Sequence, residues 1–253
     1  MTKLLRSLSE RIEKEIATSL CEACLDFGNP DDAKAKIDFA SHVQTIFKRG
    51  MDIVFSVIFL IISLPLFVIL AIAIKLTSRG DVFFKQKRVG YLGKKFTILK
   101  FRTMYQEPEN TEHKEIVQNI IKSGDSKQDE TRMLIDFINY IEKRTTPLGK
   151  FLRSSSLDEL PQLINIFLGQ MSLVGPRPHP VYEVEGYKKW YHRRLCVKPG
   201  LTGWSKLNLR LTPQNYEEAI LYDLWYVDHL SIKMDIQIIL MTIPFVLSSK
   251  DAH

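Results

Sequence analysis

The sequence predicts an α+β fold that is mostly helical and is attached to a membrane by one long, kinked helix. Three observations lead to this class. Residues 53–74 form an apolar run without a charged side chain, two basic segments of strand character follow it, and amphipathic helical patterns flank these elements. The chain has 253 residues, which is enough to bury a substantial core.

The composition narrows the class of partner. The net charge of +6 suits an anionic partner such as nucleic acid, acidic lipid or a phosphorylated substrate. An apolar segment favours lipid and phosphate over nucleic acid. The three cysteines give no disulfide framework, which is typical of a reducing compartment. Cys21 and Cys24 form a CxxC, but no second pair or nearby histidine accompanies them, so we expect neither a metal site nor a redox site there.

The N-terminal extension, residues 1–45, is predicted to be helical. Its apolar residues recur every four positions, at Leu4, Leu8, Ile12, Ile16 and Leu20. This spacing predicts an amphipathic helix. Its several glutamates dilute the basic face, so packing on the protein or on a partner is favoured over lying on the membrane surface.

The membrane segment, residues 46–80, is built around the uncharged run. About 22 residues at ~1.5 Å each give a helix of roughly 33 Å, enough to cross the hydrocarbon of a bilayer. Pro65 lies in its middle, two residues after Ser63, and predicts a kink. Basic residues flank both ends, so loop charge gives no orientation. A kinked spanning helix and a re-entrant helix that returns to its starting face both fit these residues.

A basic β-hairpin follows the membrane segment. Residues 81–90 and 95–102 have strand character, and residues 91–94 form the turn between them. Such a hairpin could hold lipid headgroups, or it could bring Lys100 and Arg102 to a phosphate.

Two further segments contain no recognisable catalytic or binding motif. Residues 105–143 are polar, with helical patterns on both sides of a charged connector, and are interpreted as an accessory or partner-binding insert. Residues 236–247 are apolar but only about 12 in number, which is too short to span a bilayer. We expect this second segment to pack on the domain or to lie in the membrane interface.

Two neighbouring carboxylates, Asp158 and Glu159, stand at a predicted helix start. The run from Ser156 to Glu159 matches a capping box. Pro161 argues against that register and favours Asp158 as the N-cap residue. In either register the helix dipole favours the ionised carboxylate that a nucleophile needs. Capping alone would also explain the pair.

Stiff loops follow this helix. Val174–Pro180 contains three prolines and a glycine, and this rigidity would hold Arg177 in place to clamp an anion. His179 beside it is interpreted as incidental. A second stiff turn, residues 198–204, leads to Arg210.

In this order, these pieces resemble the bacterial sugar transferases, the monotopic polyprenyl-phosphate phosphoglycosyl transferases. The resemblance covers roughly residues 46–104 and 144–247. The matching motifs are Lys48-Arg-x-x-Asp52, Phe83-x-Lys-Gln-x-Arg-x-Gly90, Lys100-Phe-Arg-Thr-Met104, Leu148-Gly-Lys-Phe-Leu-Arg153, Ser156-Leu-Asp-Glu-Leu-Pro-Gln162, Met171-Ser-Leu-Val-Gly-Pro-Arg-Pro178 and Pro199-Gly-Leu-Thr-Gly-Trp204.

The resemblance implies an enzyme at the cytoplasmic face of the bacterial inner membrane. It would move a sugar phosphate from a UDP-sugar to undecaprenyl phosphate, release UMP and so begin a surface glycan. Asp158 would be the nucleophile that forms a phosphosugar–aspartyl intermediate. Glu159 would be its partner, and Mg²⁺ would lie beside this pair. The implied phosphate- or substrate-binding residues are Lys100, Arg153, Arg177 and Arg210.

The resemblance also implies a monotopic fold with one kinked re-entrant helix, a small β-hairpin and interfacial amphipathic helices. Both flanks of the apolar run contain site-building sequence, so both should lie on one face of the membrane. The chain would then consist of the extension 1–45, the re-entrant helix 46–80 and a catalytic domain 81–250. Membrane lipid would be a partner and nucleic acid would not, and a homo-oligomer or downstream glycosyltransferases could be further partners.

Two departures from the family pattern bear on these expectations. Leu64 separates Ser63 from Pro65, whereas the family's helix break often has serine directly before proline. The segment Lys206-Leu-Asn-Leu-Arg210 differs from the common Gln-Val-x-Gly-Arg. The rival interpretation is a membrane-anchored scaffold in which the two carboxylates only cap a helix. A scaffold, however, does not need rigid arginine loops beside a carboxylate pair.

Overall fold

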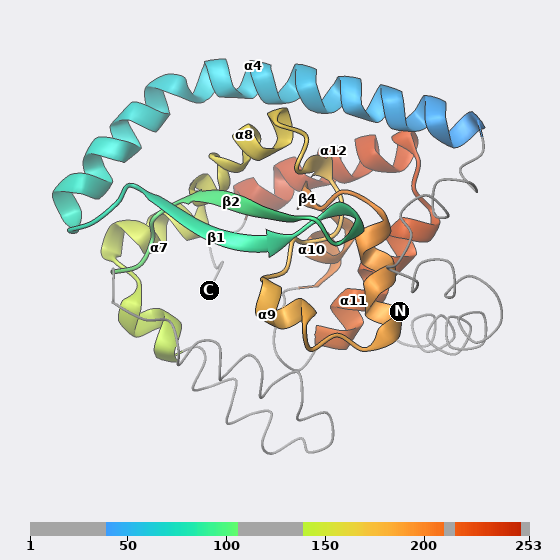
Figure 1. Cartoon of the computed structure of the whole chain (residues 1–253). Coiled ribbons are helices and arrows are strands. Elements are labelled where there is room, and N and C mark those ends of the chain that lie inside the picture. The colour runs from blue at the N-terminus through green and yellow to red at the C-terminus, as the bar shows by residue number, and fades with distance from the viewer. Residues whose placement is uncertain (1–38, 106–138, 210–215, 249–253) are drawn as a thin grey trace.

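The computed structural model describes residues 39–105, 139–209 and 216–248 (Figure 1). The predicted N-terminal amphipathic helix, most of the insert 105–143 and Arg210 lie outside these residues. The described part is mostly helical and has a two-stranded antiparallel hairpin and a short parallel strand pair. The mostly helical α+β class is therefore confirmed.

The described residues contain short strands, α-helices and 3-10 segments. The strands are β1 Phe83–Val89, β2 Lys95–Phe101, β3 Ser172–Val174 and β4 Gly200–Thr202. The α-helices are α4 Phe39–Thr77, α7 Pro147–Ser154, α8 Gln162–Phe167, α9 Val181–Val184, α10 Trp204–Asn208, α11 Tyr216–Asp228 and α12 Ile232–Ser248. The 3-10 turns are η1 Tyr91–Gly93, η2 Leu157–Glu159 and η3 Lys189–Cys196.

Helix α4 contains the predicted membrane run, and it is continuous through Pro65. Figure 1 shows it as a curved rod along one side of the molecule, with its C-terminal part bending toward the strands. The Ser63 hydroxyl donates to the Phe59 carbonyl at 2.6 Å, just before the proline. The predicted kink is thus curvature of one helix, and the helix is long and apolar enough to cross a membrane.

One face of α4 lies on the domain along most of its length. The inward positions follow a spacing of three or four residues, which is the period of a helix face. Asp52, Ser56, Leu70 and Ile74 are buried on this face. The opposite face is exposed and apolar, and only 11% of the most apolar 18-residue window is buried. That exposure argues against an encased core helix.

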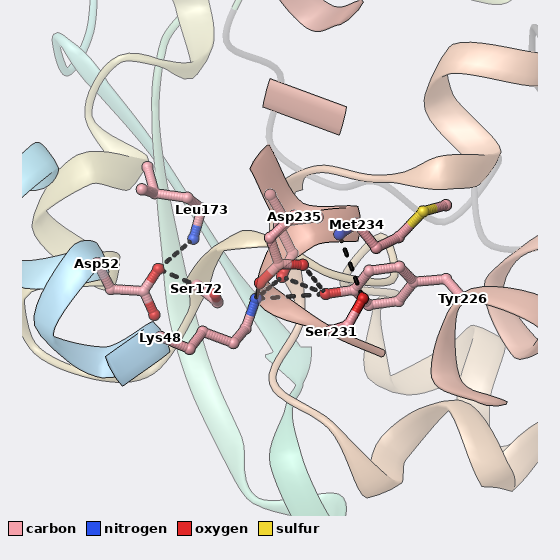
Figure 2. Close-up of polar contacts among 9 residues, drawn as sticks. Lys48, Asp52, Ser172, Leu173, Tyr226, Ser231, Met234 and Asp235 are labelled. Atoms are coloured by element: carbon pink, nitrogen blue, oxygen red, sulfur yellow. Dashed lines mark hydrogen bonds and ion pairs between the residues drawn. The ribbon is translucent and has the colours of Figure 1, made fainter. Parts of the chain in front are cut away.

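The N-terminal part of α4 is fixed to the domain by two polar residues one turn apart (Figure 2). The Lys48 amine lies 2.5 Å from the Asp235 carboxylate and donates to the Val174 carbonyl at 2.9 Å. Asp52 accepts hydrogen bonds from the Ser172 hydroxyl at 3.0 Å and from the Leu173 N–H at 2.8 Å. Both residues therefore form hydrogen bonds with strand β3.

The predicted hairpin is confirmed, with Phe83 opposite Phe101 and Val89 opposite Lys95. Its turn passes through Leu92 at φ 51° and Gly93 at φ 75°, a left-handed stretch that closes the hairpin tightly. Buried hydrophobic residues of β2 and α8 pack together beneath it.

The apolar C-terminal segment forms α12, a longer helix than the 12-residue run suggested. Met234 and Ile238 are buried against Val174 and Tyr226. Four other apolar side chains are exposed: Ile236, Leu240, Met241 and Ile243. Helix α12 runs beside α4 in Figure 1 and contacts it. This amphipathic pattern fits the predicted interfacial helix.

We expect Lys48→Met to lower the free energy of unfolding by roughly 3 kcal/mol or more, because it leaves the buried Asp235 carboxylate without its cation. Denaturant unfolding of the detergent-solubilised protein, followed by circular dichroism, measures this change. The matched control is Lys188→Met, which breaks an exposed 2.8 Å pair with Glu217 and should cost less than about 1 kcal/mol. Equal losses in the two variants would contradict the role given to Lys48.

Candidate functional site

A cavity of about 810 Å³ is lined by the hairpin, the 158–162 segment, the Arg177 loop and the β4–α10 segment. Eight cationic side chains and four carboxylates line it. The cations are Lys85, Arg88, Lys100, Arg102, Arg144, Arg153, Arg177 and Lys206. The carboxylates are Asp81, Asp158, Glu159 and Asp223. Such an excess of positive charge attracts anions.

The carboxylate pair lies on the η2 turn rather than at a helix cap. Ser156 precedes the turn at φ 56°, and its side chain makes no capping hydrogen bond. Helix α8 begins only at Gln162, with Pro161 in the N-cap position. Both capping registers expected from the sequence are therefore wrong. The left-handed turn at Ser156 instead places both carboxylates on the cavity wall.

Glu159 is held by two lysines. Its two carboxylate oxygens accept from Lys100 at 2.8 Å and from Lys206 at 2.7 Å. Burial alone would raise the pKa of Glu159, but Lys100, Lys206 and Arg177 together hold that pKa well below its usual range. Glu159 is therefore an ionised carboxylate that positions two cations.

Asp158 has a different environment. Its carboxylate is buried and lies 3.8 Å from the Lys100 amine. Burial raises the pKa of Asp158 above its ordinary value, with Lys100 opposing this shift and the charge of Glu159 adding to it. The expectation that a helix N-terminus favours the ionised form of Asp158 is wrong, because no α-helix begins at this carboxylate. Neighbouring carboxyl groups with opposed pKa shifts are typical of sites that divide chemical roles.

Arg153 is oriented by threonines from two segments. Its Nε donates to the Thr103 hydroxyl at 3.0 Å, and its Nη1 donates to the Thr145 hydroxyl at 3.4 Å. Helix α7, which carries Arg153, lies very close to the backbone at Thr103. A Cβ on Gly149 would lie only 1.9 Å from the Thr103 carbonyl oxygen, so glycine allows this approach. The two predicted motifs around residues 100–104 and 148–153 thus meet at the cavity.

The Arg177 loop is fixed from behind through its backbone. Arg194 donates to the Arg177 carbonyl at 2.8 Å and also forms an ion pair with Asp223. Arg88 donates to the Pro178 carbonyl at 2.8 Å. These two contacts hold the backbone of the loop at Arg177 and at Pro178, and the Arg177 side chain lines the cavity.

His179 belongs to the packing behind this loop. Its Nδ1 lies 2.7 Å from the Tyr187 hydroxyl and 3.1 Å from the Tyr216 hydroxyl. Burial, followed by the charges of Arg194, Arg177 and Arg88, holds the pKa of His179 well below its ordinary value. His179 also lines the cavity and lies 3.2 Å from the Glu183 carboxylate, so its interpretation as incidental stays a prediction.

The structure brings five of the predicted site residues to one cavity: Lys100, Arg153, Asp158, Glu159 and Arg177. Ser63 and Pro65 lie on α4 and not among the lining residues. Sequence reasoning missed Lys206, which it treated only as part of an unusual segment. Its position directly after the stiff turn 198–204 was the available signal. The contributions of Arg88 and Arg144 were also missed.

The chain is similar to known proteins over most of its length. A family model described as "Bacterial sugar transferase" matches residues 43–249. The UDP-glucose:undecaprenyl-phosphate glucose-1-phosphate transferase of Klebsiella pneumoniae is 38% identical over 208 residues, which are 79% of this chain and 40% of that protein. The exopolysaccharide production protein ExoY of Sinorhizobium fredii is 36% identical over 211 residues, 82% of this chain and 88% of that protein. The chain thus spans about 40% of the length of the longer relatives.

Glycines allow the Arg177 loop and strand β4 to touch. A Cβ on Gly200 would lie 2.1 Å from the Gly175 nitrogen. We expect Gly200→Ala to lower the free energy of unfolding by roughly 1–3 kcal/mol, because the backbones must separate. Thermal or denaturant unfolding measures the loss. The control is Gly50→Ala on α4, where an added Cβ meets nothing within 4 Å, and an equal effect there would refute the close-approach argument.

Proposed function

The chain belongs to the bacterial sugar transferase family, and from this premise we propose that it transfers a sugar phosphate from a UDP-sugar to undecaprenyl phosphate. The observation that carries the proposal is the Asp158–Glu159 pair on the wall of a cationic cavity beside an exposed apolar helix. A cavity with this excess of positive charge suits a diphosphate donor and a phosphate acceptor together. Relatives in Klebsiella pneumoniae and Escherichia coli are UDP-glucose:undecaprenyl-phosphate glucose-1-phosphate transferases, which makes UDP-glucose the first donor to test.

The reaction proceeds in two displacements at one phosphorus atom. An Asp158 oxygen attacks the sugar-bearing phosphorus of the donor, the bond from this phosphorus to the bridging oxygen breaks, and UMP leaves with that oxygen. A phosphate oxygen of the acceptor then attacks the same phosphorus and releases Asp158. The product is a polyprenyl diphosphate-linked sugar. A covalent intermediate separates one difficult step between two anions into two easier ones.

The surrounding residues have distinct roles in these steps. Lys100, Arg153 and Arg177 stabilise negative charge on the phosphate oxygens. Glu159 keeps Lys100 and Lys206 in place through its two short hydrogen bonds. Only the ionised form of Asp158 is a nucleophile. Burial raises the pKa of Asp158 and favours the protonated form, whereas the positive charges of Lys100, Arg153 and Lys206 favour the ionised form.

The donor set permits a Mg²⁺ ion at Asp158. Mg²⁺ commonly takes one or two carboxylates and completes its coordination with substrate phosphate oxygens and water. Asp158 can supply such an oxygen, whereas both Glu159 oxygens already accept from lysines, so Glu159 would have to release one of them to become a ligand. When bound, the ion would neutralise charge on the donor diphosphate.

We further propose that α4 is re-entrant and that the chain acts at the cytoplasmic face of the bacterial inner membrane. The domain contacts α4 from Lys48 near its start to Ile74 near its end. A spanning arrangement would carry the charged cavity and its ion pairs into hydrocarbon, at a large desolvation cost. An α4 that enters and leaves through one face keeps the cavity in the headgroup layer, where a soluble donor meets a lipid acceptor.

Replacing the nucleophile tests the chemistry. We expect Asp158→Asn to reduce UMP release from a UDP-sugar by about 10³-fold or more, because loss of a nucleophile removes the covalent route. UMP release and mass spectrometry of a trapped phosphosugar adduct measure this change. Asp228→Asn, which affects an ion pair with Arg193, is the control and should retain activity. Full turnover by Asp158→Asn would sink the proposed mechanism and favour the scaffold interpretation.

Cysteine labelling tests the membrane arrangement. In a background without the native cysteines, single cysteines at Thr45 and Arg79 flank the apolar run. We expect a membrane-impermeant thiol reagent to label both from the cytoplasmic side, because both ends of a re-entrant helix share one face. Labelling from opposite sides of sealed vesicles would show a spanning helix instead.

A further inference from the structure

Arg102 is a buried cation where the cavity adjoins the end of α4. It lines the cavity together with Lys100 and Arg153, yet only 8% of the residue is exposed. Its Nη2 donates to the carbonyl of Ser78 at 2.7 Å and to its hydroxyl at 2.9 Å. Ser78 follows the last residue of α4 directly, so Arg102 links the membrane helix to the cavity.

The rest of this guanidinium has no partner in the described part of the chain. Nε and Nη1 are buried and make no hydrogen bond, and no described carboxylate pairs with the side chain. A buried donor without a partner lowers the stability of the fold, and more so when the group is charged. Native proteins rarely leave such groups unpaired unless a ligand, ion or water completes them. A buried cation with unpaired donors suits a phosphate.

The wall next to Arg102 is apolar and aromatic. Phe83 stacks on Phe101 with ring centroids 5.5 Å apart, and Phe67 of α4 lies 5.1 Å from Phe101. Phe83 and Phe84 line the cavity and are each 36% exposed. An apolar strip thus leads from Arg102 to α4. The Arg177 end of the cavity instead has backbone carbonyls and buried polar side chains.

We propose that Arg102 binds the phosphate of the polyprenyl acceptor while its hydrocarbon chain lies along Phe83 and Phe84 toward α4. This assignment rests on the proposed function. It leaves Arg177 to the donor diphosphate and brings the acceptor to Asp158 from the membrane side. Nε and Nη1 are buried, so the guanidinium must turn toward the cavity before either of them can donate to the phosphate.

Separating the two half-reactions tests the assignment. We expect Arg102→Gln to raise the KM for undecaprenyl phosphate by roughly tenfold to a hundredfold, the usual effect of losing a charge-assisted hydrogen bond. Single-turnover UMP release without acceptor, and the KM for the UDP-sugar, should stay within about twofold of wild type. Arg102→Lys should restore part of the acceptor affinity. Arg79→Gln, an exposed arginine at the same end of α4, is the matched control for general attraction to the membrane.

Direct binding distinguishes a lipid phosphate from any phosphate. The probes are farnesyl phosphate, inorganic phosphate and farnesol, each titrated against the full chain, the Arg102 variants and the Arg79 control in detergent. The proposal expects farnesyl phosphate to bind much more tightly than the other two probes, and only the Arg102 variants to weaken it. Equal binding of inorganic phosphate would overturn the lipid assignment.

Other outcomes also decide the question. A loss of single-turnover UMP release in Arg102→Gln would assign Arg102 to the donor and overturn the proposal. Unchanged acceptor kinetics and binding would make Arg102 a structural residue of the α4 junction. If Arg102→Gln fails to fold, Arg102→Lys decides through its own acceptor KM and its farnesyl phosphate affinity. If wild type releases UMP from no UDP-sugar, the proposed function fails while the binding titration still tests Arg102.

Discussion

Lys48 and Asp52 lie one turn apart on helix α4 and both bind the backbone or side chains of strand β3. The end of that strand is the start of the Arg177 loop, and its parallel neighbour β4 leads to Lys206. The contacts that hold α4 on the domain therefore also determine where Arg177 and Lys206 lie in the cavity. A shift of α4 against β3 would be transmitted over only a few residues to the cavity.

The two adjacent carboxylates of the cavity differ in their contacts with the surrounding cations, and their pKa values shift in opposite directions. Glu159 is committed to two lysines, and this keeps the pKa of that carboxyl low. Asp158 lies beside the same charges but makes fewer close contacts, so burial dominates and its pKa rises. The fold thereby gives two adjacent carboxyl groups opposite pKa shifts.

Much of this arrangement could be predicted from the sequence, because the relevant signals are local. The apolar run gave α4, and the hairpin and the stiff Arg177 loop follow from strand and turn chemistry. The geometry at Asp158 could not be predicted, because the left-handed turn at Ser156 replaces the cap that the local pattern suggests. Lys206 was missed for another reason. Its contact with Glu159 joins residues 47 apart in sequence, and its position after the stiff turn does not identify that partner.

Helix α4 touches the domain along one side and exposes apolar residues on the other. A helix that spans a bilayer must match the thickness of the hydrocarbon, and mismatch costs a fraction of a kcal/mol per Å. A helix seated lengthwise on its own domain is immersed only to a depth set by its exposed face. In the proposed arrangement, the protein should tolerate membranes of different acyl-chain length and respond more strongly to how tightly the lipid headgroups pack. The contacts between α4 and the domain would also fix the distance of the cavity from the hydrocarbon. In the proposed arrangement, α4 would therefore both anchor the protein and set how deeply it lies in the membrane.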